Sequence, residues 1–401
     1  MISTIDSSDA TDATSTIVET GCITESPATS NSANNIPPSE GIEDHHQSGE
    51  ELLPCEVFWR DQYELLEEYG YTLRARYHPN WKPSWIGTSK RSDECEDGQL
   101  PPASGIMDAS CPDGTLVMLK QISSEDKEIY LGELLSQRDF NSFKFPENHC
   151  VPFLEILEPP NCRYAILVMP YLVDWALAPF ETIGEVVEFF RQIFEGLLFM
   201  HNQNIAHTNI KFNNIMADSL SSFSYPPHPS SPPMKYDFSG KTEVVRSRTK
   251  HPIKYYFGLS DTFDSKTETS EQPPFGGTRN CPGVWRSNIS PCNLFLVDIF
   301  CTGNVIRQFL FDDDGSINRP KQGFMFMREL VDDMINSDPL KRPSMKQVVE
   351  RYEIIYTGLS EWKLRSPVVT ARKRFKLRKA VMHWTKQLVR MARGIPAIPR
   401  V

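Results

Sequence analysis

The sequence predicts a mixed α+β fold in which a small β-rich part precedes a larger helical part. Residues 114–122 form a turn and then an apolar run, and residues 151–157 and 164–169 are two further runs typical of strands. A longer amphipathic stretch begins at Thr182 and predicts a helix to about His201. Strands and helices that are grouped in this way, instead of alternating, favour an α+β domain.

Composition indicates a globular core with polar ends. The chain has 401 residues, of which 39% are hydrophobic and 23% are charged. No apolar run is long enough to span a bilayer, and the N-terminus lacks the regions of a secretory signal. The nine scattered cysteines contain no Cys-x-x-Cys pair, which favours reduced thiols over a zinc site or disulfides. We therefore expect a cytoplasmic protein, with a nuclear location as an alternative.

Charge is distributed unevenly along the chain. Eleven acids and no Lys or Arg precede Arg60, whereas twelve bases and no acid follow Glu361. These ends nearly cancel, so the net charge of −10 leaves a mildly acidic middle. A domain of that charge is not expected to bind DNA.

These patterns divide the chain into four regions. The head is rich in Ser, Thr, Asn, Asp and Pro and is too poor in apolar residues to offset the entropy of ordering, so we expect it to be disordered. An extension follows, with a short amphipathic helix at 55–68, and is expected to pack on the main domain. The basic tail ends the chain. The four ranges are 1–50 (head), 51–104 (extension), 105–355 (main domain) and 356–401 (tail).

Within the main domain, further helices are expected at 124–137, 294–310 and 324–337. The residues Thr182 to Glu185 have the pattern of a capping box. Residues 217–252 are rich in Ser and Pro and predict a long surface loop. A loop of that length in a compact domain is either functional or disordered.

The segment from His207 to Asn214 carries the strongest functional signal. Its spacing resembles the catalytic loop of protein kinases, which reads His-Arg-Asp, four residues and then Asn. Thr208 stands at the Arg position and Asn209 at the position of the catalytic Asp. An amide cannot accept a proton from a substrate hydroxyl as a carboxylate can. The resemblance implies that Lys211 stabilises the transferred phosphoryl group and that Asn214 binds Mg²⁺.

Several ordered motifs extend this resemblance over about residues 105–355. The chain is similar to members of the protein-kinase superfamily, and in particular to the kinase-like proteins of mushroom-forming fungi. The resemblance implies a two-lobed fold, with a small β-rich N-lobe at about 105–171 and a larger helical C-lobe at about 172–355. It also implies ATP and Mg²⁺ as the ligands of an intact site.

The resemblance assigns candidate ATP-binding residues. In Val117-Met118-Leu119-Lys120, Lys120 matches the lysine that holds the α- and β-phosphates. Glu128 matches its ion-pair partner, with Glu125 and Glu133 as alternatives. The gatekeeper and hinge correspond to Met169, Pro170 and Leu172, and Pro170 still offers its carbonyl to adenine. No G-x-G-x-x-G motif precedes Lys120.

The metal-binding Asp-Phe-Gly motif is altered. The matching residues are Tyr256, Phe257 and Gly258, and a tyrosine does not hold Mg²⁺ as a carboxylate does. One alternative is 237–240, which reads Asp-Phe-Ser-Gly but lies in the polar loop. Another is the loss of three residues, by evolution or through an error in the gene model.

The scaffold motifs match better than the chemical ones. The resemblance implies structural roles for His207, Phe257 and Gly258, and for Asp298, which would brace the catalytic-loop backbone. Residues 277–284 resemble the end of an activation segment, with Gly283 in place of the usual Glu. The Arg that normally pairs with that Glu corresponds to Arg342, which would need another carboxylate or water.

These observations predict a catalytically impaired pseudokinase that acts as a scaffold or allosteric partner in signalling, either with or without bound ATP. One alternative is a weak Ser/Thr protein kinase that uses Lys120, Lys211 and Asn214 with a substitute Asp. Another is a protein that acts through its tail, which could bind an anionic membrane surface, direct nuclear import or bind nucleic acid. The tail could also fold back on the acidic head or on the domain.

Overall fold

The computed structural model describes residues 50–136, 145–160, 162–258, 263–264, 293–313, 319–370 and 377–401, with only the backbone given at 263–264. The chain divides into Met1–His46 and Gln47–Val401, and the described residues all belong to the second unit. The predicted disordered head, apart from Glu50, lies outside the described residues. So do residues 277–284, which include Gly283.

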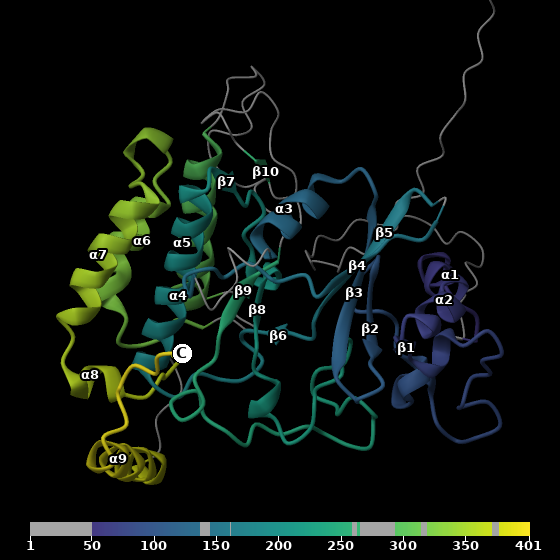
Figure 1. Cartoon of the computed structure of the whole chain (residues 1–401). Helices are drawn as coiled ribbons and strands as arrows, with labels where there is room; N and C mark the ends of the chain where they lie inside the picture. Colours follow the sequence, from purple (N-terminus) through teal and green to yellow (C-terminus); the bar gives the residue numbers. More distant parts are fainter. Residues whose placement is uncertain are drawn as a thin grey trace, which may run out of the picture. The chain divides into compact units, whose positions relative to one another are not determined.

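A five-stranded antiparallel sheet forms the β-rich part (Figure 1). Its strands follow the order β1-β2-β3-β5-β4. In β3 the buried residues Val117 and Leu119 alternate with Met118 and Lys120, as expected where successive side chains point to opposite faces. The strands span Thr72–Leu73 (β1), Ile106–Ser110 (β2), Leu116–Ser123 (β3), Glu155–Leu157 (β4) and Tyr164–Pro170 (β5).

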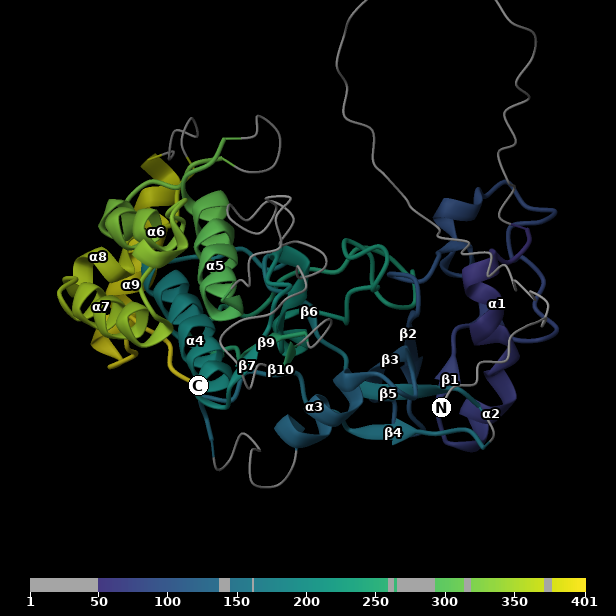
Figure 2. The same cartoon turned by 90° about the horizontal axis from the view of Figure 1, so that it is seen from above.

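One face of this sheet is covered by the N-terminal extension. Two short helices, α1 (Pro54–Asp61) and α2 (Tyr63–Glu68), replace the single helix expected at 55–68. Trp59 and Leu66 from these helices pack with sheet residues such as Met107 and Leu119, and all four are fully buried. Figure 2 shows α1 and α2 beside β1, at the opposite end from the C-terminal helices.

The opposite face of the sheet carries a different set of side chains. Asp108 is paired in register with Met118, and Ile106 with Lys120. Directly opposed residues of an antiparallel pair point to the same face, so Asp108, Met118 and Lys120 share the face that is turned away from α1 and α2.

Helices form the second part of the domain. Their core is α4 (Ile183–Asn202), which is buried over most of its surface by α5 (Leu294–Leu310), α7 (Met345–Thr357) and neighbouring strands. Thr182 caps α4 by accepting a hydrogen bond from the Glu185 backbone N–H at 3.3 Å. The Glu185 carboxylate in turn accepts a hydrogen bond from the backbone N–H of Glu181 at 2.6 Å, one residue earlier than a capping box predicts.

The remaining elements complete this part. Helix α3 (Lys127–Ser136) starts three residues later than expected. The helix expected at 324–337 is shorter: α6 spans Arg328–Met334, and a 3₁₀ turn precedes it. Strands β6 (Val173–Asp174), β8 (Ile215–Ala217) and β9 (Tyr255–Phe257) form a second sheet. Strand β7 (Ile205–Ala206) pairs with β10 (Phe263–Asp264). Two helices, α8 (Glu361–Arg365) and α9 (Leu377–Ala392), follow α7. No helix among the described residues is long and apolar enough to cross a membrane.

The Ser- and Pro-rich segment 217–252 is largely irregular, as its composition predicts, but buried side chains anchor it to the domain. His228, Arg248 and Thr249 are buried in it, and isolated bridges such as Pro227–Lys235 fold it back on itself. The buried guanidinium of Arg248 donates to the carbonyl of Trp175 at 2.7 Å and also to that of Ala178. A few large buried side chains anchor this segment. The average composition of the segment does not show which side chains these are.

Candidate nucleotide site and predicted catalytic loop

Lys120 and Glu128 form an ion pair at the start of α3. The lysine Nζ lies 2.5 Å and 2.7 Å from the two carboxylate oxygens of Glu128. Glu128 is largely buried, and the Lys120 side chain is 19% exposed. This contact selects Glu128 over the alternatives Glu125 and Glu133. The pair holds an ammonium group on the sheet face that also bears Met118 and Asp108.

Asp298 in α5 holds the backbone of the predicted catalytic loop. Its carboxylate accepts hydrogen bonds from the backbone N–H of His207 at 2.8 Å and of Thr208 at 2.7 Å. His201 lies 3.0 Å from the same carboxylate through Nε2. Because Asp298 is fully buried, these bonds fix the loop strongly. Thr208 adopts a positive φ of 60°, a conformation that costs energy for a β-branched residue.

The rest of the loop is also ordered. Asn209 is buried, and its carbonyl accepts a hydrogen bond from the Asn214 side chain at 2.8 Å. Lys211 precedes a short 3₁₀ turn and Asn214 is its last residue, and both are half-buried. The loop therefore places an amide, an ammonium group and a second amide in one short segment. No carboxylate belongs to it.

Residues 256–258 join this loop from β9. The Gly258 backbone N–H donates to the Asn214 carbonyl at 2.9 Å, and His207 Nε2 donates to the Gly258 carbonyl at 2.6 Å. The Phe257 ring is fully buried, and its backbone N–H donates to the His149 carbonyl at 2.7 Å. These bonds attach the segment to the loop through backbone groups.

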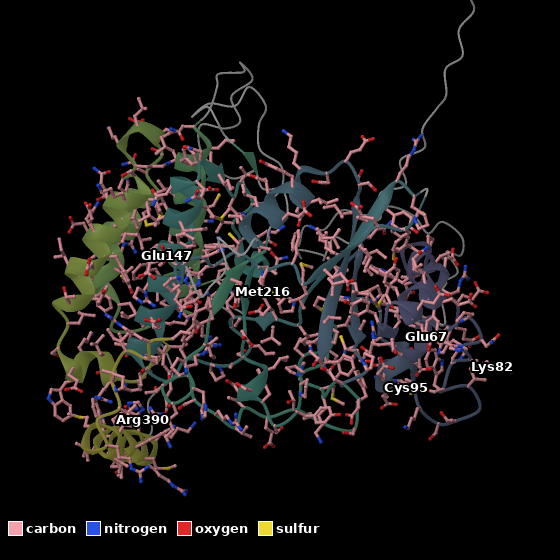
Figure 3. All side chains as sticks on the ribbon, in the orientation of Figure 1. Glu67, Lys82, Cys95, Glu147, Met216 and Arg390 are labelled. Atoms are coloured by element: carbon pink, nitrogen blue, oxygen red, sulfur yellow. The ribbon has the colours of Figure 1, made fainter. Side chains whose placement is uncertain are left out.

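Tyr256 occupies the position that the kinase resemblance assigns to the metal-binding Asp. It pairs in register with Met216 of β8, which Figure 3 labels near the centre of the molecule. Burial, and to a lesser extent the charge of Asp218, raise the pKa of Tyr256 to about 12. The phenol is therefore neutral at physiological pH and a poor ligand for a hard cation. Among the described residues, no group of three or more His, Cys, Asp or Glu is placed to hold a metal ion.

The alternative metal motif at 237–240 lies in a turn of segment 217–252. Asp237 Oδ1 accepts a hydrogen bond from the backbone N–H of Ser239 at 2.9 Å, which lowers the pKa of the Asp237 carboxyl. Phe238 has a positive φ of 56° and packs edge-on against His228. No strand precedes this turn. The Asp-Phe-Ser-Gly sequence at 237–240 therefore forms a turn in the loop, unlike a metal-binding motif that follows a strand.

The residues predicted as the gatekeeper and hinge lie at the end of β5 and directly after it. Met169 and Pro170 pair with Met118 and Val117 of β3, and Leu172 is buried. Tyr171, between them, donates a hydrogen bond from its hydroxyl to the carbonyl of Pro227 at 2.7 Å. Segment 217–252 therefore contacts the predicted hinge.

The same segment covers the sheet face that bears Lys120. Tyr236 donates a hydrogen bond to Asp108 Oδ2 at 2.8 Å, and its ring lies edge-on to Tyr171 with centroids 6.2 Å apart. Phe223 and Tyr171 are buried in this cluster, and Met118 and Tyr236 pack against it. The apolar part of this face is thus occupied by side chains of the chain itself.

A buried charge cluster reinforces the cover. Arg74, which is 5% exposed, forms an ion pair with Asp108 at 3.1 Å and donates to the carbonyls of Gln99 and Leu100. Ser230 donates to the same Leu100 carbonyl at 2.6 Å, so the N-terminal extension and segment 217–252 meet at one point. Sequence reasoning did not identify this cluster. Its only signal was a pair of charges, Asp108 within the apolar strand β2 and Arg74 directly after β1.

Arg342 was expected to need a carboxylate or water. Its guanidinium donates to the backbone carbonyls of Asn336 at 2.8 Å and Leu296 at 3.0 Å, and it lies 4.8 Å from the centroid of the Phe300 ring. Backbone carbonyls and an aromatic face thus partner this cation. They join α5 to the segment that precedes α7.

A scan against protein-family models and a search of curated proteins found no match to this chain.

Proposed function

We propose that this chain is a two-lobed, protein-kinase-like pseudoenzyme that acts as a scaffold or allosteric partner. One observation carries the proposal. The loop that resembles a kinase catalytic loop is held in place by Asp298, but it lacks the carboxylate that would act as the general base. Asp298 fixes the loop backbone, and the Lys120–Glu128 pair stands on the facing sheet, yet Asn209 and Tyr256 replace both carboxylates. Loss of a general base alone removes about 10²–10⁴-fold in rate.

The cover of segment 217–252 also opposes nucleotide binding. Adenine would have to lie beside the hinge on the Lys120 face, where Tyr236 is bonded to Asp108. Displacing Tyr236 would leave a buried carboxylate that has lost one of its partners, which is costly. The proposal is therefore that ATP and Mg²⁺ do not bind at ordinary cellular concentrations.

A thermal-stability measurement tests this proposal. We expect no Mg²⁺-dependent rise in the melting temperature with millimolar ATP, because a ligand stabilises the folded state only when its concentration exceeds its Kd. Lys120→Ala is the matched variant. A Mg²⁺-dependent rise that disappears in Lys120→Ala would show that the nucleotide site is open and would contradict the proposal.

Phosphate transfer is tested separately. We expect no incorporation of labelled phosphate into the protein or into a generic Ser/Thr substrate. The Asn209→Asp variant should also be inactive, because position 256 still has a tyrosine in place of the carboxylate that binds Mg²⁺. Asn213→Asp is the control for the added charge, since Asn213 is exposed in the same segment. Transfer by the wild-type protein that Lys120→Ala abolishes would refute the pseudoenzyme.

A weak Ser/Thr kinase is the second candidate. It is favoured by the ordered positions of Lys120, Lys211 and Asn214, together with Asp218, whose charge acts on Tyr256. Asp218, which directly follows β8, is our candidate for the substitute carboxylate. In that case, Asp218→Asn would remove the activity that Lys120→Ala also removes.

A further inference from the structure

Helix α9 faces the domain with its polar side. The buried residues of this helix are His383, Gln387 and Arg390, whose spacing places them on one face. His383 Nε2 donates to the carbonyl of Arg365 at 2.8 Å, and Arg390 donates to Glu181 at 2.9 Å and to Ser247 at 2.7 Å. Figure 3 labels Arg390 where α9 meets the domain.

Large hydrophobic side chains lie on the outward side of α9: Leu377 (81% exposed), Val381 (58%), Met382 (62%), Leu388 (53%) and Val389 (45%). Arg378, Lys379, Thr385 and Lys386 of this helix are also exposed. Leu377, Val381 and Leu388 follow at intervals of four and seven residues, and Met382 and Val389 are seven residues apart, so the hydrophobic side chains form an apolar stripe on one side of the helix. A surface helix of a globular protein normally buries such a stripe, so this helix has the reverse orientation.

The inward side of α9 is incompletely satisfied. Both polar atoms of the Gln387 side chain, and Nε and Nη1 of Arg390, are buried without a hydrogen-bond partner. Apolar burial on this side is small, apart from Trp384, which lies 5.6 Å from Trp362 between ring centroids. Packing on the domain therefore does not account for the amphipathic character of α9.

A groove runs beside the stripe. It has a volume of about 480 Å³, and its apolar lining includes Met382, Val389 and Ile395. The basic residues Lys250 and Arg393 also line it. An apolar groove with cationic walls fits a ligand with hydrocarbon chains and an anionic headgroup.

We propose that α9 binds an anionic lipid bilayer through its outward apolar stripe. The charge of this region supports a lipid surface: twelve bases and no acid follow Glu361. A helix with an apolar face, flanking Lys and Arg and a Trp lies in the interface of a membrane, and anionic lipids add to its affinity. This inference goes beyond the proposed function and does not depend on the nucleotide site.

Two other occupants fit the same observations less well. If a second copy of this chain bound through α9, two tails with twelve bases each would lie against one another and repel. The head of this chain has the complementary acids but consists mainly of Ser, Thr, Asn, Asp and Pro, which do not fill an apolar stripe. A bilayer supplies both the negative charge and the hydrocarbon.

Vesicle co-sedimentation of the full chain tests this inference. We expect the protein to sediment with vesicles of phosphatidylcholine and phosphatidylserine, to bind phosphatidylcholine vesicles more weakly, and to bind less as salt is raised. The Val381→Ser/Leu388→Ser variant should lower the affinity by about tenfold or more, because it removes apolar area from the stripe without changing charge. Both side chains are more than half exposed, so folding should be unaffected.

Controls make the result specific. Ile354→Ser, at an exposed position of α7 (73% exposed), should bind like the wild-type protein. Leu377→Ser/Met382→Ser repeats the test at independent positions of the stripe. The proposal is overturned if the wild-type protein does not bind phosphatidylserine vesicles at low salt, or if both stripe variants bind these vesicles as tightly as the wild-type protein does. A wild-type dimer in light scattering that the stripe variants convert to monomer also overturns it, since the stripe would then bind a second copy.

Discussion

The hydroxyl of Tyr236 donates a hydrogen bond to the buried carboxylate of Asp108 at 2.8 Å across 128 residues of sequence. Burial and the charge of Asp108 raise the pKa of Tyr236 far above its ordinary value, so the phenol remains a proton donor throughout the neutral range. This bond attaches segment 217–252 to the sheet face that bears Lys120. It connects segment 217–252 with the loss of nucleotide binding that we propose.

Tyr236→Phe should destabilise the fold by about 1–3 kcal/mol, because Asp108 would lose a hydrogen bond in a buried site. Urea denaturation measures this change. Tyr225→Phe is the control in the same segment, since Tyr225 is 42% exposed and should change stability little. Equal stability of the two variants would mean that the bond to Asp108 does not hold the segment.

Asp298→Ala should cost about 3 kcal/mol or more, because it leaves the backbone N–H groups of His207 and Thr208 buried without an acceptor. Chemical denaturation measures the loss. Asp332→Ala removes an exposed ion pair with Arg328 and should cost at most about 0.5 kcal/mol. A small effect at Asp298 would contradict its role as the brace of the loop.

His149 should make stability depend on pH. Burial lowers its pKa from 6.5 to about 3, and its Nδ1 donates to the Tyr255 carbonyl at 2.7 Å. Between these two values the unfolded chain binds a proton that the folded chain does not, so stability falls as pH drops below 6.5. The slope from this residue approaches about 1.4 kcal/mol per pH unit.

Denaturation between pH 6.5 and pH 5 measures that slope, within the window set by the two pKa values of His149. His149→Gln should flatten the profile, whereas His78→Gln should not, because the His78 side chain is exposed and not buried like that of His149. Parallel profiles for wild type and His149→Gln would show that His149 is protonated in the folded protein.

Gly184→Ala should displace the C-terminal segment. A Cβ at Gly184 would lie 2.0 Å from the carbonyl oxygen of Ala397, so the backbone there must move. We expect a loss of about 1–3 kcal/mol, which thermal denaturation measures. Gly358→Ala is the control, since its Cβ would approach no atom closer than 3.4 Å. Unchanged stability in Gly184→Ala would indicate that residues near Ala397 do not pack on α4.

Local patterns in the sequence located most of the regular elements. The apolar period placed α4 and α5, and a Lys on an apolar strand with Glu128 on the following helix gave a specific ion pair. Boundaries were less well predicted, as in α6, because the 3₁₀ turn before it and the Asn-Ser-Asp-Pro sequence after it limit the helix. The partners of Arg342 could not be predicted, because backbone carbonyls carry no sequence signal.

By itself the sequence determined the mixed α+β class, the amide at Asn209 and the basic, amphipathic character of the tail, since these depend on residue type and local period. Only the tertiary structure decided that Tyr236 covers the Lys120 face and that α9 turns its apolar stripe outward. The physical reason is that a periodic pattern defines two faces of a helix or segment but not which face is buried. That choice depends on partners far away in the chain, such as Asp108 and Glu181.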